Sequence, residues 1–404
     1  MTRVSKVPID KNRPSPEWIE SLRRRFPIEP EIDRVLTRKL TLRAGGSYSP
    51  IGLDALSKSL QALLEAKVEG AFEILDPTWL SGGASKLQMR FKLSWNRPGI
   101  GRILTDMVVR MEPAESIVET SRLREFQLLS ALDGVLPVPP TFWADPYGDY
   151  FPYPAIIYGF VEGVVKPTGA VSNVSGLGIN FGSPVRALLA PQFVGHLAKL
   201  HLWDWGKKME GSAFATPSLG TQPTEWQLNW WARVWEEDGN EDVPLLRLAL
   251  AWLRENMPST DRLSMIHGDY RAGNFLYTEH ESRISAWLDW ELAHLGDRHE
   301  DLAFASMRVL GHFAEDGKTF LVNGMMPAEA FFEAYEKASG LTVEIKKIKY
   351  FHVFYAFRAA VLLLGTGYRA VRGGKTHQDL VLAWIMALGY SIQEELREIL
   401  EEVA

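Results

Sequence analysis

One stretch, 265–301, gathers polar side chains of the types that carry out chemistry. Two short apolar runs, 265–266 and 284–288, each lead directly into an acidic segment. Among its polar residues are His267, Asp269, Asn274, Asp289, Asp297 and Asp301. A short apolar run that ends at an acid is typical of a strand that presents the acid at its end. We therefore expect two strand ends that bring acids into one cleft.

Asp269, Asn274 and Asp289 have the types and order of a magnesium–phosphate site. Asp269 and Asn274 lie five residues apart after the first apolar run. An aspartate within hydrogen-bond reach of an acceptor hydroxyl can act as a general base. The amide oxygen of Asn274 and the carboxylate of Asp289 are hard ligands, and Mg²⁺ prefers such oxygens together with those of phosphates. Phosphoryl transfer at such a site needs mainly positioning and charge neutralisation.

Each of these residues also has a plainer interpretation. An Asp–Asn loop is commonly a turn, and an Asp after an apolar run is often a helix cap. We expect Asp297 and Asp301 to cap or anchor loops, and His267 to support the loop by hydrogen bonds to the backbone. His294 and His299 are expected at the surface, because their segment is polar. A hydrolase metal site built from His267, Asp269 and His294 is an alternative, although such clusters are usually more tightly spaced.

Composition limits the class of protein and its partners. The 404 residues exceed one ordinary domain, so two domains or two lobes are expected. The net charge of −6 and the absence of a basic stripe argue against nucleic acid as a partner. Cysteine is absent, which rules out thiolate catalysis. The N-terminal residues show no secretory signal, and the longest apolar run, 353–364, is too short to span a bilayer and contains Arg358. We expect a cytoplasmic protein that does not enter a membrane.

The first part of the chain predicts a small antiparallel sheet. Apolar or alternating segments at 71–75, 87–95 and 105–111 are separated by a glycine hairpin and a clear turn, and a further apolar strand is expected at 155–161. The hairpin residues are Gly82, Gly83, Ala84 and Ser85. Their backbone amides could approach phosphates, because glycine leaves no side chain in the way. Many hairpins carry Gly-Gly without this role.

Helices dominate elsewhere in the sequence. A helix is predicted over 116–131, where Arg122, Arg124 and Glu125 are expected to be mostly solvated, while 35–42 fits either a strand or a helix turn. From about 162 onward the patterns are mostly helical. A tryptophan-rich segment, Trp226, Trp230, Trp231 and Trp235, is expected in the core, or else beside an apolar acceptor. The acidic run 236–238 is expected to be a solvated helix end.

Taken together, these motifs resemble the aminoglycoside phosphotransferase and choline kinase superfamily, which shares the protein-kinase-like fold. The resemblance rests on His267-Gly268-Asp269 with Asn274, on Asp289-Trp290-Glu291, and on Gly296-Asp297. The Asp269–Asn274 spacing is that of the kinase catalytic loop. The resemblance covers about 55–400 and points to the branch whose kinase-like domains are sometimes fused to acyl-CoA dehydrogenases.

The resemblance implies an α+β fold of two lobes, a small antiparallel β N-lobe and a larger, mainly helical C-lobe. The implied limits are an N-terminal extension at 1–54, an N-lobe at 55–161 and a C-lobe at 162–404. The implied activity is Mg²⁺-dependent transfer of the γ-phosphate of ATP or GTP to a hydroxyl of a small acceptor. Some members of the branch phosphorylate hydroxyacyl-CoA thioesters, and an aminoglycoside-like acceptor is the alternative. Oligomeric state is not implied.

The resemblance also assigns roles to residues of this sequence. Asp269 is the implied catalytic base, Asn274 and Asp289 are the metal ligands, and His267, Arg271 and Asp297 support them. The implied nucleotide-binding residues are Gly82, Gly83, Ala84, Ser85, Arg110, Glu125, Ile157, Tyr158 and Phe160. Kinases carry a lysine where this chain has Arg110, and Lys92 is a second candidate for that cation.

Two other functions remain to be weighed against the small-molecule kinase. A catalytically silent kinase-like module that only binds nucleotide usually lacks the base or a metal ligand, and this sequence has both. A protein kinase would show Asp-Phe-Gly and Ala-Pro-Glu motifs, which are absent after the catalytic loop.

Overall fold

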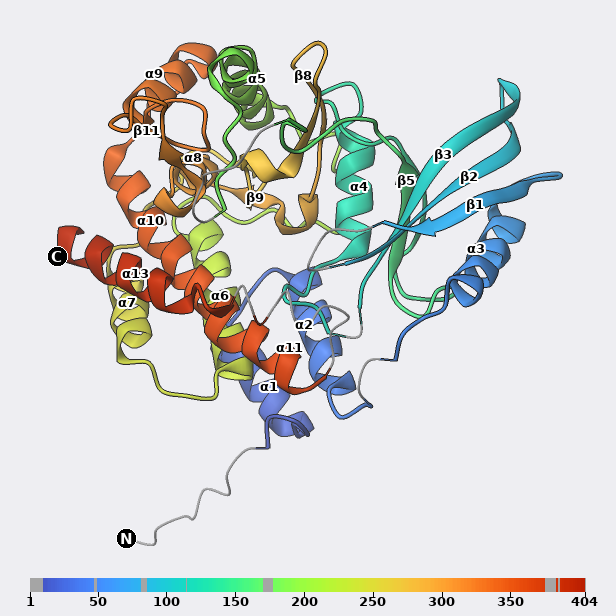
Figure 1. Cartoon of the computed structure of the whole chain (residues 1–404). Helices are drawn as coiled ribbons and strands as arrows, with labels where there is room; N and C mark the ends of the chain where they lie inside the picture. Colours follow the sequence, from blue (N-terminus) through green and yellow to red (C-terminus); the bar gives the residue numbers. More distant parts are fainter. Residues whose placement is uncertain are drawn as a thin grey trace, which may run out of the picture.

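The computed structural model describes residues 10–46, 49–80, 86–113, 115–169, 177–374, 383 and 386–403 of the chain. It has two lobes: a five-stranded antiparallel sheet with helices α3 and α4 beside it, and a larger lobe made mainly of helices (Figure 1). The predicted α+β class and two-lobed arrangement are therefore confirmed.

The sheet has the strand order β1-β2-β3-β5-β4, with every neighbouring pair antiparallel. Four of these strands (β1, β2, β3 and β5) and the turn between β2 and β3 were expected from the sequence, whereas β4 was not. The strands are β1 Glu73–Trp79, β2 Leu87–Arg97, β3 Gly101–Met111, β4 Thr141–Asp145 and β5 Ala155–Gly159.

The two faces of the sheet meet different surroundings, because successive side chains of a strand point to opposite sides. Helix α3 (Leu53–Lys67) covers the outer face with Leu56, Leu60, Leu63 and Leu64. It packs there on alternate residues of β2, such as Met89, Phe91 and Leu93. On the other face, Val108, Ile156 and Tyr158 join the main core that the sheet shares with α4 and the helical lobe. The inner face of the sheet therefore packs in one core with residues of the stretch 265–301.

Helix α4 (Arg122–Leu132) begins six residues later than the sequence pattern predicted, after the N-cap Ser121, whose hydroxyl accepts from the Arg124 amide at 3.3 Å. The expectation that its charges are solvated was wrong. Arg122, Arg124 and Glu125 are 1%, 4% and 2% exposed. Each charge is held by ion pairs to other segments rather than by water, as described below.

The N-terminal helices α1 (Pro16–Arg25) and α2 (Pro30–Leu42) pack on the helical lobe, against α6 (Gln222–Asp238). Segment 35–42, left open between strand and helix, is helical. Trp230 and Trp231 are core residues and stack with ring centroids 5.3 Å apart, while Trp226 and Trp235 are half-buried.

The acidic run at the end of α6 was expected to be solvated, and this was wrong for Glu237 and Asp238, which are fully buried. Lys39 of α2 lies 3.2 Å from Glu237 and 3.0 Å from Asp238. Arg43 lies 2.5 Å from Asp238. The two carboxylates therefore anchor the N-terminal helices to the helical lobe.

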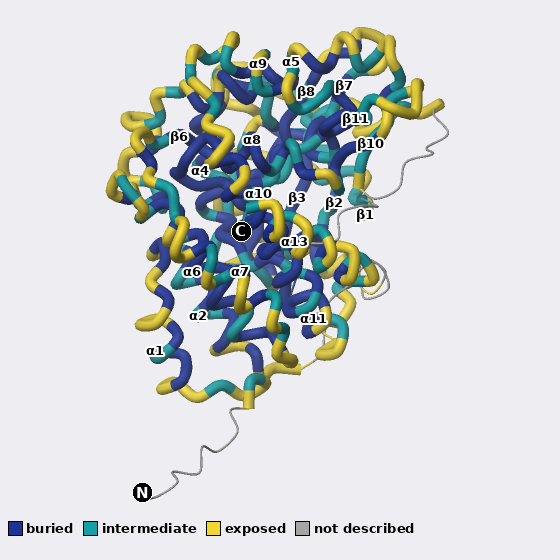
Figure 2. The backbone as a smooth tube through the Cα atoms, turned by 90° about the vertical axis from the view of Figure 1, so that its left-hand side faces the viewer, coloured by how far each residue is buried: buried dark blue, intermediate teal, exposed yellow. Residues whose placement is uncertain are grey.

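The helical lobe forms the larger buried core, which Figure 2 shows as dark segments within a shell of exposed loops. Short strand pairs β6–β9, β7–β8 and β10–β11 lie among its helices. Its remaining elements are α5 Ser183–Leu202, α7 Pro244–Glu255, β6 Ser264–Ile266, η1 Ala272–Asn274, β7 Phe275–Thr278, β8 Arg283–Trp287, η2 Trp290–Leu292, β9 His294–Gly296, α8 His299–Ala305, η3 Arg308–Leu310, β10 His312–Phe313, β11 Phe320–Leu321, α9 Ala328–Ser339, α10 Ile345–Ala360, the π-helix η4 Val361–Gly367, α11 Tyr368–Arg372 and α13 Gly389–Val403.

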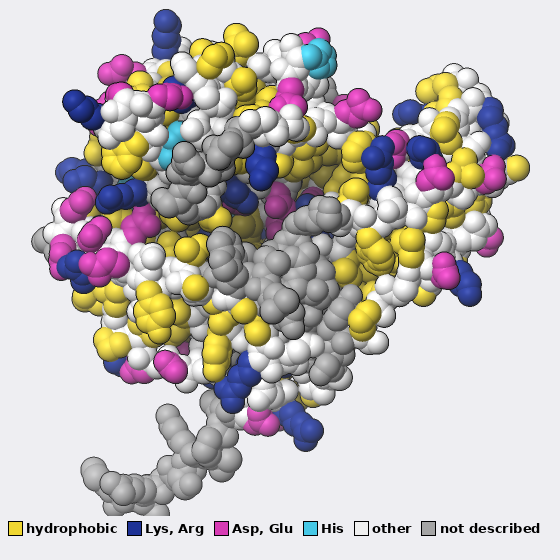
Figure 3. Space-filling model, viewed as in Figure 1, with side chains coloured by type: hydrophobic (Ala, Val, Ile, Leu, Met, Phe, Trp, Pro, Cys, Tyr) yellow, Lys and Arg dark blue, Asp and Glu magenta, His cyan; other side chains and the backbone are white. Residues whose placement is uncertain are grey.

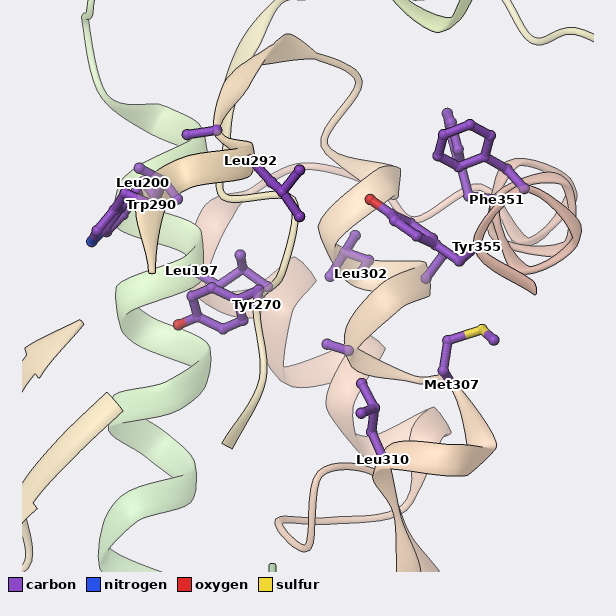
Figure 4. Close-up of a cluster of buried hydrophobic side chains, with 14 of the residues drawn as sticks. Leu197, Leu200, Tyr270, Trp290, Leu292, Leu302, Met307, Leu310, Phe351 and Tyr355 are labelled. Carbon is purple, nitrogen blue, oxygen red and sulfur yellow. The ribbon is translucent and has the colours of Figure 1, made fainter. Parts of the chain in front are cut away.

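A continuous helical segment, Ile345–Arg372, is long and apolar enough to cross a membrane by length and composition alone. Of its most apolar 18-residue window, 72% is buried inside the fold. Phe351 and Tyr355 of this segment pack toward α8 in the core (Figure 4). This burial is the pattern of a core helix.

Candidate active site

Two short strand pairs place the acidic loops side by side. Strand β6 ends at Ile266, and η1 then leads through Asn274 into β7, which pairs with β8. The backbone amide of Leu288 donates to the carbonyl of Asn274 at 2.8 Å. Asp289, the next residue, is therefore held close to the loop that carries Asp269 and Asn274. The two strand ends expected from the sequence do meet.

Asp269 and Asn274 are in direct contact. The Asn274 Nδ2 donates to the Asp269 carboxylate at 2.5 Å and to the Asp269 backbone carbonyl at 2.8 Å. Both contacts use the amide nitrogen, so neither of them engages the Asn274 Oδ1. Arg271 lies 3.3 Å from the other carboxylate oxygen of Asp269. The Asp269 side chain keeps 19% of its surface exposed, so a substrate can reach it.

Asp289 has a left-handed backbone conformation, with φ 65° and ψ 45°. Non-glycine residues adopt it at some energetic cost, and aspartate is among those that tolerate it best. The conformation turns the chain sharply from β8 into η2. The carboxylate is 29% exposed and pairs with Arg110 on β3 of the other lobe. Asp289 therefore joins the lobes while keeping one side accessible.

Arg110 is the strand cation that the structure brings to this site, and Lys92 is not. The Arg110 guanidinium is 6% exposed, pairs with Asp289 and lies 3.7 Å from Glu125 of α4. Burial opposes its charge, but Asp289, Glu125 and Glu291 outweigh this and hold the pKa of Arg110 well above its usual range. Lys92 instead pairs with Asp76 at 2.9 Å, and its side chain is 41% exposed.

A buried charge cluster extends from Arg110 and was not anticipated from the sequence. Its further cations are Lys86 and Arg122, both with fully buried side chains. Glu112 lies 2.7 Å from Lys86 and 2.8 Å from Arg122, and Glu291 lies 3.2 Å and 3.0 Å from the same cations. We refer to Lys86, Arg110, Arg122, Glu112, Glu125, Asp289 and Glu291 as the cleft cluster.

Glu291 forms ion pairs with all three cations of this cluster. Burial favours its neutral form, but Lys86, Arg110 and Arg122 together lower the pKa of Glu291 to about 2. Glu125 responds in the opposite direction: burial raises its pKa although Arg110 and Arg122 oppose the rise. The signal that could have revealed the cluster is the repeated pairing of charge with apolar neighbours in 108–112 and 121–126.

His267 supports the catalytic loop, as expected. Its Nε2 donates to the Leu288 carbonyl at 3.0 Å, and its Nδ1 accepts from the Asp269 amide at 3.3 Å. Burial lowers the pKa of His267, which favours this neutral ring despite nearby carboxylates. Both nitrogens are engaged, so the ring has no free lone pair for a metal. This argues against the hydrolase arrangement.

Asp301 and Arg358 hold the loop from beneath. The Asp301 carboxylate accepts from the amides of His267 at 2.8 Å and Gly268 at 2.9 Å. Arg358 of α10 donates to the Gly268 carbonyl at 2.8 Å. Gly268 has φ 78°, and a Cβ there would lie 2.7 Å from the Leu292 carbonyl, so only glycine fits. Figure 4 shows the apolar packing around Tyr270 on which this loop rests.

Asp297 lies outside this contact set. It accepts from His299 at 2.5 Å and from Lys347 at 3.0 Å, so it ties α8 to α10. The expectation that His294 and His299 lie at the surface was wrong, since they are 3% and 0% exposed. His294 contacts the Leu292 carbonyl and Glu300, both at 2.9 Å. These residues brace the segment after Asp289 rather than form its cleft.

The residues expected to contact a nucleotide are only partly described. Gly82, Gly83, Ala84 and Ser85 lie outside the described residues. Tyr158 lies on the inner face of the sheet, and Phe160 lies under the Arg90 guanidinium, 3.7 Å from ring centroid to Cζ. Ile157 points to the opposite face and packs in the core with α3, so only its backbone is available to a ligand.

The arrangement suits a divalent cation. Four carboxylates of the cleft cluster face three cations, and Asp269 adds a further carboxylate beside Asn274. Asp289 and the Asn274 Oδ1 are hard oxygen donors of the kind that Mg²⁺ takes together with phosphate oxygens. Figure 3 shows a hollow between the lobes in which acidic and basic side chains lie next to one another.

The two lobes, the antiparallel sheet and the Asp–Asn loop facing a second Asp define a protein-kinase-like phosphotransferase fold. Residues 80–342 match the model of the phosphotransferase enzyme family, APH. The chain belongs to this family.

Among solved structures, a Ralstonia eutropha protein provisionally named an aminoglycoside phosphotransferase is similar, with a TM-score of 0.62 and 22% identity over 86% of this chain and 98% of that one. A macrolide 2′-phosphotransferase type I gives a TM-score of 0.52 and 18% identity, over 84% and 98%. An ethanolamine kinase from Plasmodium vivax gives 0.51 and 12%, over 89% and 94%. These likenesses establish the shared fold.

Among curated proteins, mouse acyl-CoA dehydrogenase family member 10 is 23% identical over 369 residues, which are 85% of this chain and 32% of that protein. Probable acyl-CoA dehydrogenase IBR3 of Arabidopsis thaliana is 27% identical over 335 residues, 74% of this chain and 38% of that protein. The chain thus spans about a third of the length of these relatives. The matches agree with the branch that the motifs resembled.

Proposed function

We propose that this protein is a small-molecule kinase that transfers the γ-phosphate of ATP or GTP to a hydroxyl of a small acceptor. The observation that carries the proposal is the convergence of Asp269, Asn274 and Asp289 at one accessible point, facing Arg110 from the other lobe. Phosphoryl transfer requires a base or orienting carboxylate, hard metal ligands and a cation for phosphate, all held in place.

Asp269 is the proposed base, because its carboxylate is accessible and oriented by Asn274 and Arg271. It would orient the acceptor hydroxyl and take its proton. Asn274 and Asp289 would hold Mg²⁺, which supplies charge neutralisation for the phosphate oxygens. His267 keeps the loops of these residues at a fixed separation through its bonds to Asp269 and Leu288.

Arg110 is the proposed phosphate-contacting cation. Its partner Asp289 is also a proposed metal ligand, so Arg110 could exchange that contact for a phosphate when Asp289 turns to the metal. Glu125 and Glu291 would keep the guanidinium in place meanwhile. Tyr158 and Phe160, on the inner side of the sheet, are the proposed contacts for the nucleotide base, together with the glycine hairpin over the phosphates.

The acceptor is proposed to be a hydroxyacyl-CoA thioester rather than an aminoglycoside-like compound. A polycationic aminoglycoside needs accessible acids, and the acidic run 236–238 at the end of α6 is mostly engaged in buried ion pairs of Glu237 and Asp238. The similarity to proteins named acyl-CoA dehydrogenase family members supports the thioester.

An ADP-release assay over hydroxyacyl-CoAs, aminoglycosides, macrolides and choline-like alcohols tests both donor and acceptor, run once with ATP and once with GTP. We expect turnover with a hydroxyacyl-CoA that falls by about 10³-fold in Asp269→Ala, while Mg²⁺–nucleotide binding stays within about twofold. Wild-type turnover in Asp269→Ala would disprove the role of this residue. A Mg²⁺-dependent nucleotide thermal shift without turnover on any acceptor would favour a silent binding module.

A pair of matched variants tests the strand cation. Arg110→Met should reduce kcat/KM by about 10²-fold, because a buried cation at the phosphates is lost. Lys92→Met removes an equal charge from the same sheet and should change kcat/KM by less than about twofold, since its pair with Asp76 is exposed. The reverse order of effects would assign the role to Lys92.

A further inference from the structure

A second charged concavity lies where the N-terminal arm and the end of α2 meet the end of α6 and the short helix α11. It has a volume of about 680 Å³, and its cations are Lys11, Arg13, Arg43, Arg369 and Arg372. Its acids are Asp10 and Glu115. We refer to it as the arm pocket. None of the residues proposed for catalysis, metal or nucleotide lines it.

The arm pocket is lined by more cations than carboxylates, and three cations converge on Asp238 at its floor. The Asp238 carboxylate lies 2.5 Å from Arg43, 3.0 Å from Lys39 and 3.7 Å from Arg369. The Nε atoms of Arg43 and Arg369 are buried and have no hydrogen-bond partner. These unused donors belong to side chains only 1% and 9% exposed. Buried guanidinium N–H groups without acceptors are costly, and an added acceptor would relieve them.

The cations also act unfavourably on one another. Burial lowers the pKa of Arg369, and the neighbouring Arg43 lowers it further. Burial likewise lowers the pKa of Lys11, with Arg369 and Arg43 contributing although Glu236 and Asp238 oppose them. The Lys11 ammonium donates to the Gly239 carbonyl at 2.5 Å, and no carboxylate among the described residues forms an ion pair with it. Burial opposes the charge of Arg43, but Asp238, Glu237 and Glu115 outweigh it and raise the pKa of Arg43. The unbalanced charge of the pocket therefore lies mainly with its other cations.

Two further arginines stand at the rim. Arg13 and Arg372 are exposed, and neither makes an ion pair among the residues that the structure describes. Arginine presents a planar fork of donors that fits phosphate oxygens bidentately. A ring of cations around a concave floor is unusual on a chain whose net charge is −6.

We propose that the arm pocket binds a phosphate-bearing small molecule, with Arg43 and Arg369 at the floor and Arg13 and Arg372 at the rim gripping its phosphate oxygens. The volume is within the range of roughly 300–1,000 Å³ that small-molecule sites occupy. None of the residues of the proposed catalytic cleft lines the arm pocket, so binding there does not depend on the proposed phosphotransferase activity. The shared chemistry is a dianionic phosphate or pyrophosphate group, either free or esterified to an organic molecule.

The test is calorimetric titration of the full chain with inorganic pyrophosphate in Mg²⁺-free buffer. The double variant Arg13→Glu/Arg372→Glu changes only exposed side chains, and Arg24→Glu is the matched control, because it reverses an exposed arginine on α1 outside the pocket. We expect one pyrophosphate per chain, weakened by about tenfold or more in the double variant and unchanged in the control. Unchanged thermal midpoints verify that both variants fold.

A parallel titration with phenyl phosphate, which lacks the nucleoside that the proposed catalytic cleft would bind, separates the two sources of the phosphate. Tighter binding of phenyl phosphate than of pyrophosphate, lost in the double variant, identifies an organic phosphate as the ligand, whereas equal or weaker binding identifies the inorganic ion. No measurable pyrophosphate binding would overturn the proposal. Equal binding by the wild type and the double variant would overturn it as well, since the ion would then bind elsewhere.

Discussion

Two buried charge clusters hold this molecule together, and they differ in the sign of their imbalance. In the cleft cluster, three cations meet four carboxylates between the lobes. In the cluster between the N-terminal helices and α6, the acids are Asp33, Glu237 and Asp238, and they face Lys39, Arg43, Arg233 and Arg369. The first cluster has an excess of negative charge, and the second an excess of positive charge.

The sign of the excess charge indicates which kind of ion each cluster can bind. Uncompensated buried charge is expensive, so an excess of one sign favours binding of the other. A divalent metal would complete the cleft cluster, and a phosphate group would complete the other. The clusters also differ in access: Asp289 is 29% exposed, while Glu237 and Asp238 have no exposed side-chain surface. A carboxylate of the first cluster can therefore contact a substrate. The carboxylates of the second cluster only join segments of the chain, and its cations Arg43 and Arg369 line the arm pocket.

The largest expected effect separates chemistry from folding. Asp289→Asn should lower kcat by about 10³-fold and weaken Mg²⁺-dependent nucleotide binding, because a hard anionic ligand is lost. The fold should persist, since Arg110 keeps Glu125 and Glu291. ADP release and a Mg²⁺ titration measure this, with thermal unfolding as the check on the fold. Normal Mg²⁺ dependence in this variant would remove Asp289 from the metal site.

The equivalent Asp-to-Asn substitution in the second cluster should lower stability rather than activity. Asp238→Asn leaves Lys39, Arg43 and Arg369 without their shared anion, which should lower the free energy of unfolding by about 3–5 kcal/mol. Urea unfolding measures the loss. Glu236→Gln, two residues earlier in the sequence but 43% exposed, should change stability by less than about 1 kcal/mol. Equal effects of the two variants would contradict the role given to burial.

A third variant asks whether the N-terminal helices reach the cleft. Glu29 lies 2.8 Å from Arg124 of α4, and Arg124 also donates to the Ala293 carbonyl at 2.5 Å. Glu29→Gln should loosen α4 and displace Glu125, lowering kcat by about tenfold with little change in KM for nucleotide. Glu20→Gln on exposed α1 is the control. A loss of stability with unchanged kcat would restrict Glu29 to a structural role.

The smallest expected effect is a pH dependence beside the cleft cluster. Burial, together with Glu112, raises the pKa of Glu119 to about 7. The unfolded carboxyl titrates near about 4.3, so the folded state holds the proton more tightly. The free energy of unfolding should therefore fall as pH rises between those two values. Glu119→Gln should flatten this fall, measured by urea unfolding at a series of pH values, and an unchanged slope would exclude Glu119 as its source.

The sequence was sufficient for the fold class through the family resemblance of its motifs, and for the meeting of Asp269, Asn274 and Asp289 through the local signals of short apolar runs and fixed spacing. It was insufficient for Arg122, Glu237, Asp238 and the histidines His294 and His299. A charged residue looks solvated when its partner lies far away in the chain, as Arg43 lies from Asp238. Burial of charge is decided by tertiary pairing, which no local pattern records.

Arg358 links the catalytic loop to a helix that lies beyond residue 342, where the family match ends. The helices that bury Glu237 and Asp238 lie before residue 80, where the match begins. A fragment cut at the family limits would thus lose the donor to Gly268 and leave Asp238 without its three cations, while Glu237 would keep only Arg233. The region that matches the family model is therefore shorter than the segment of the chain that must be kept for these contacts to form.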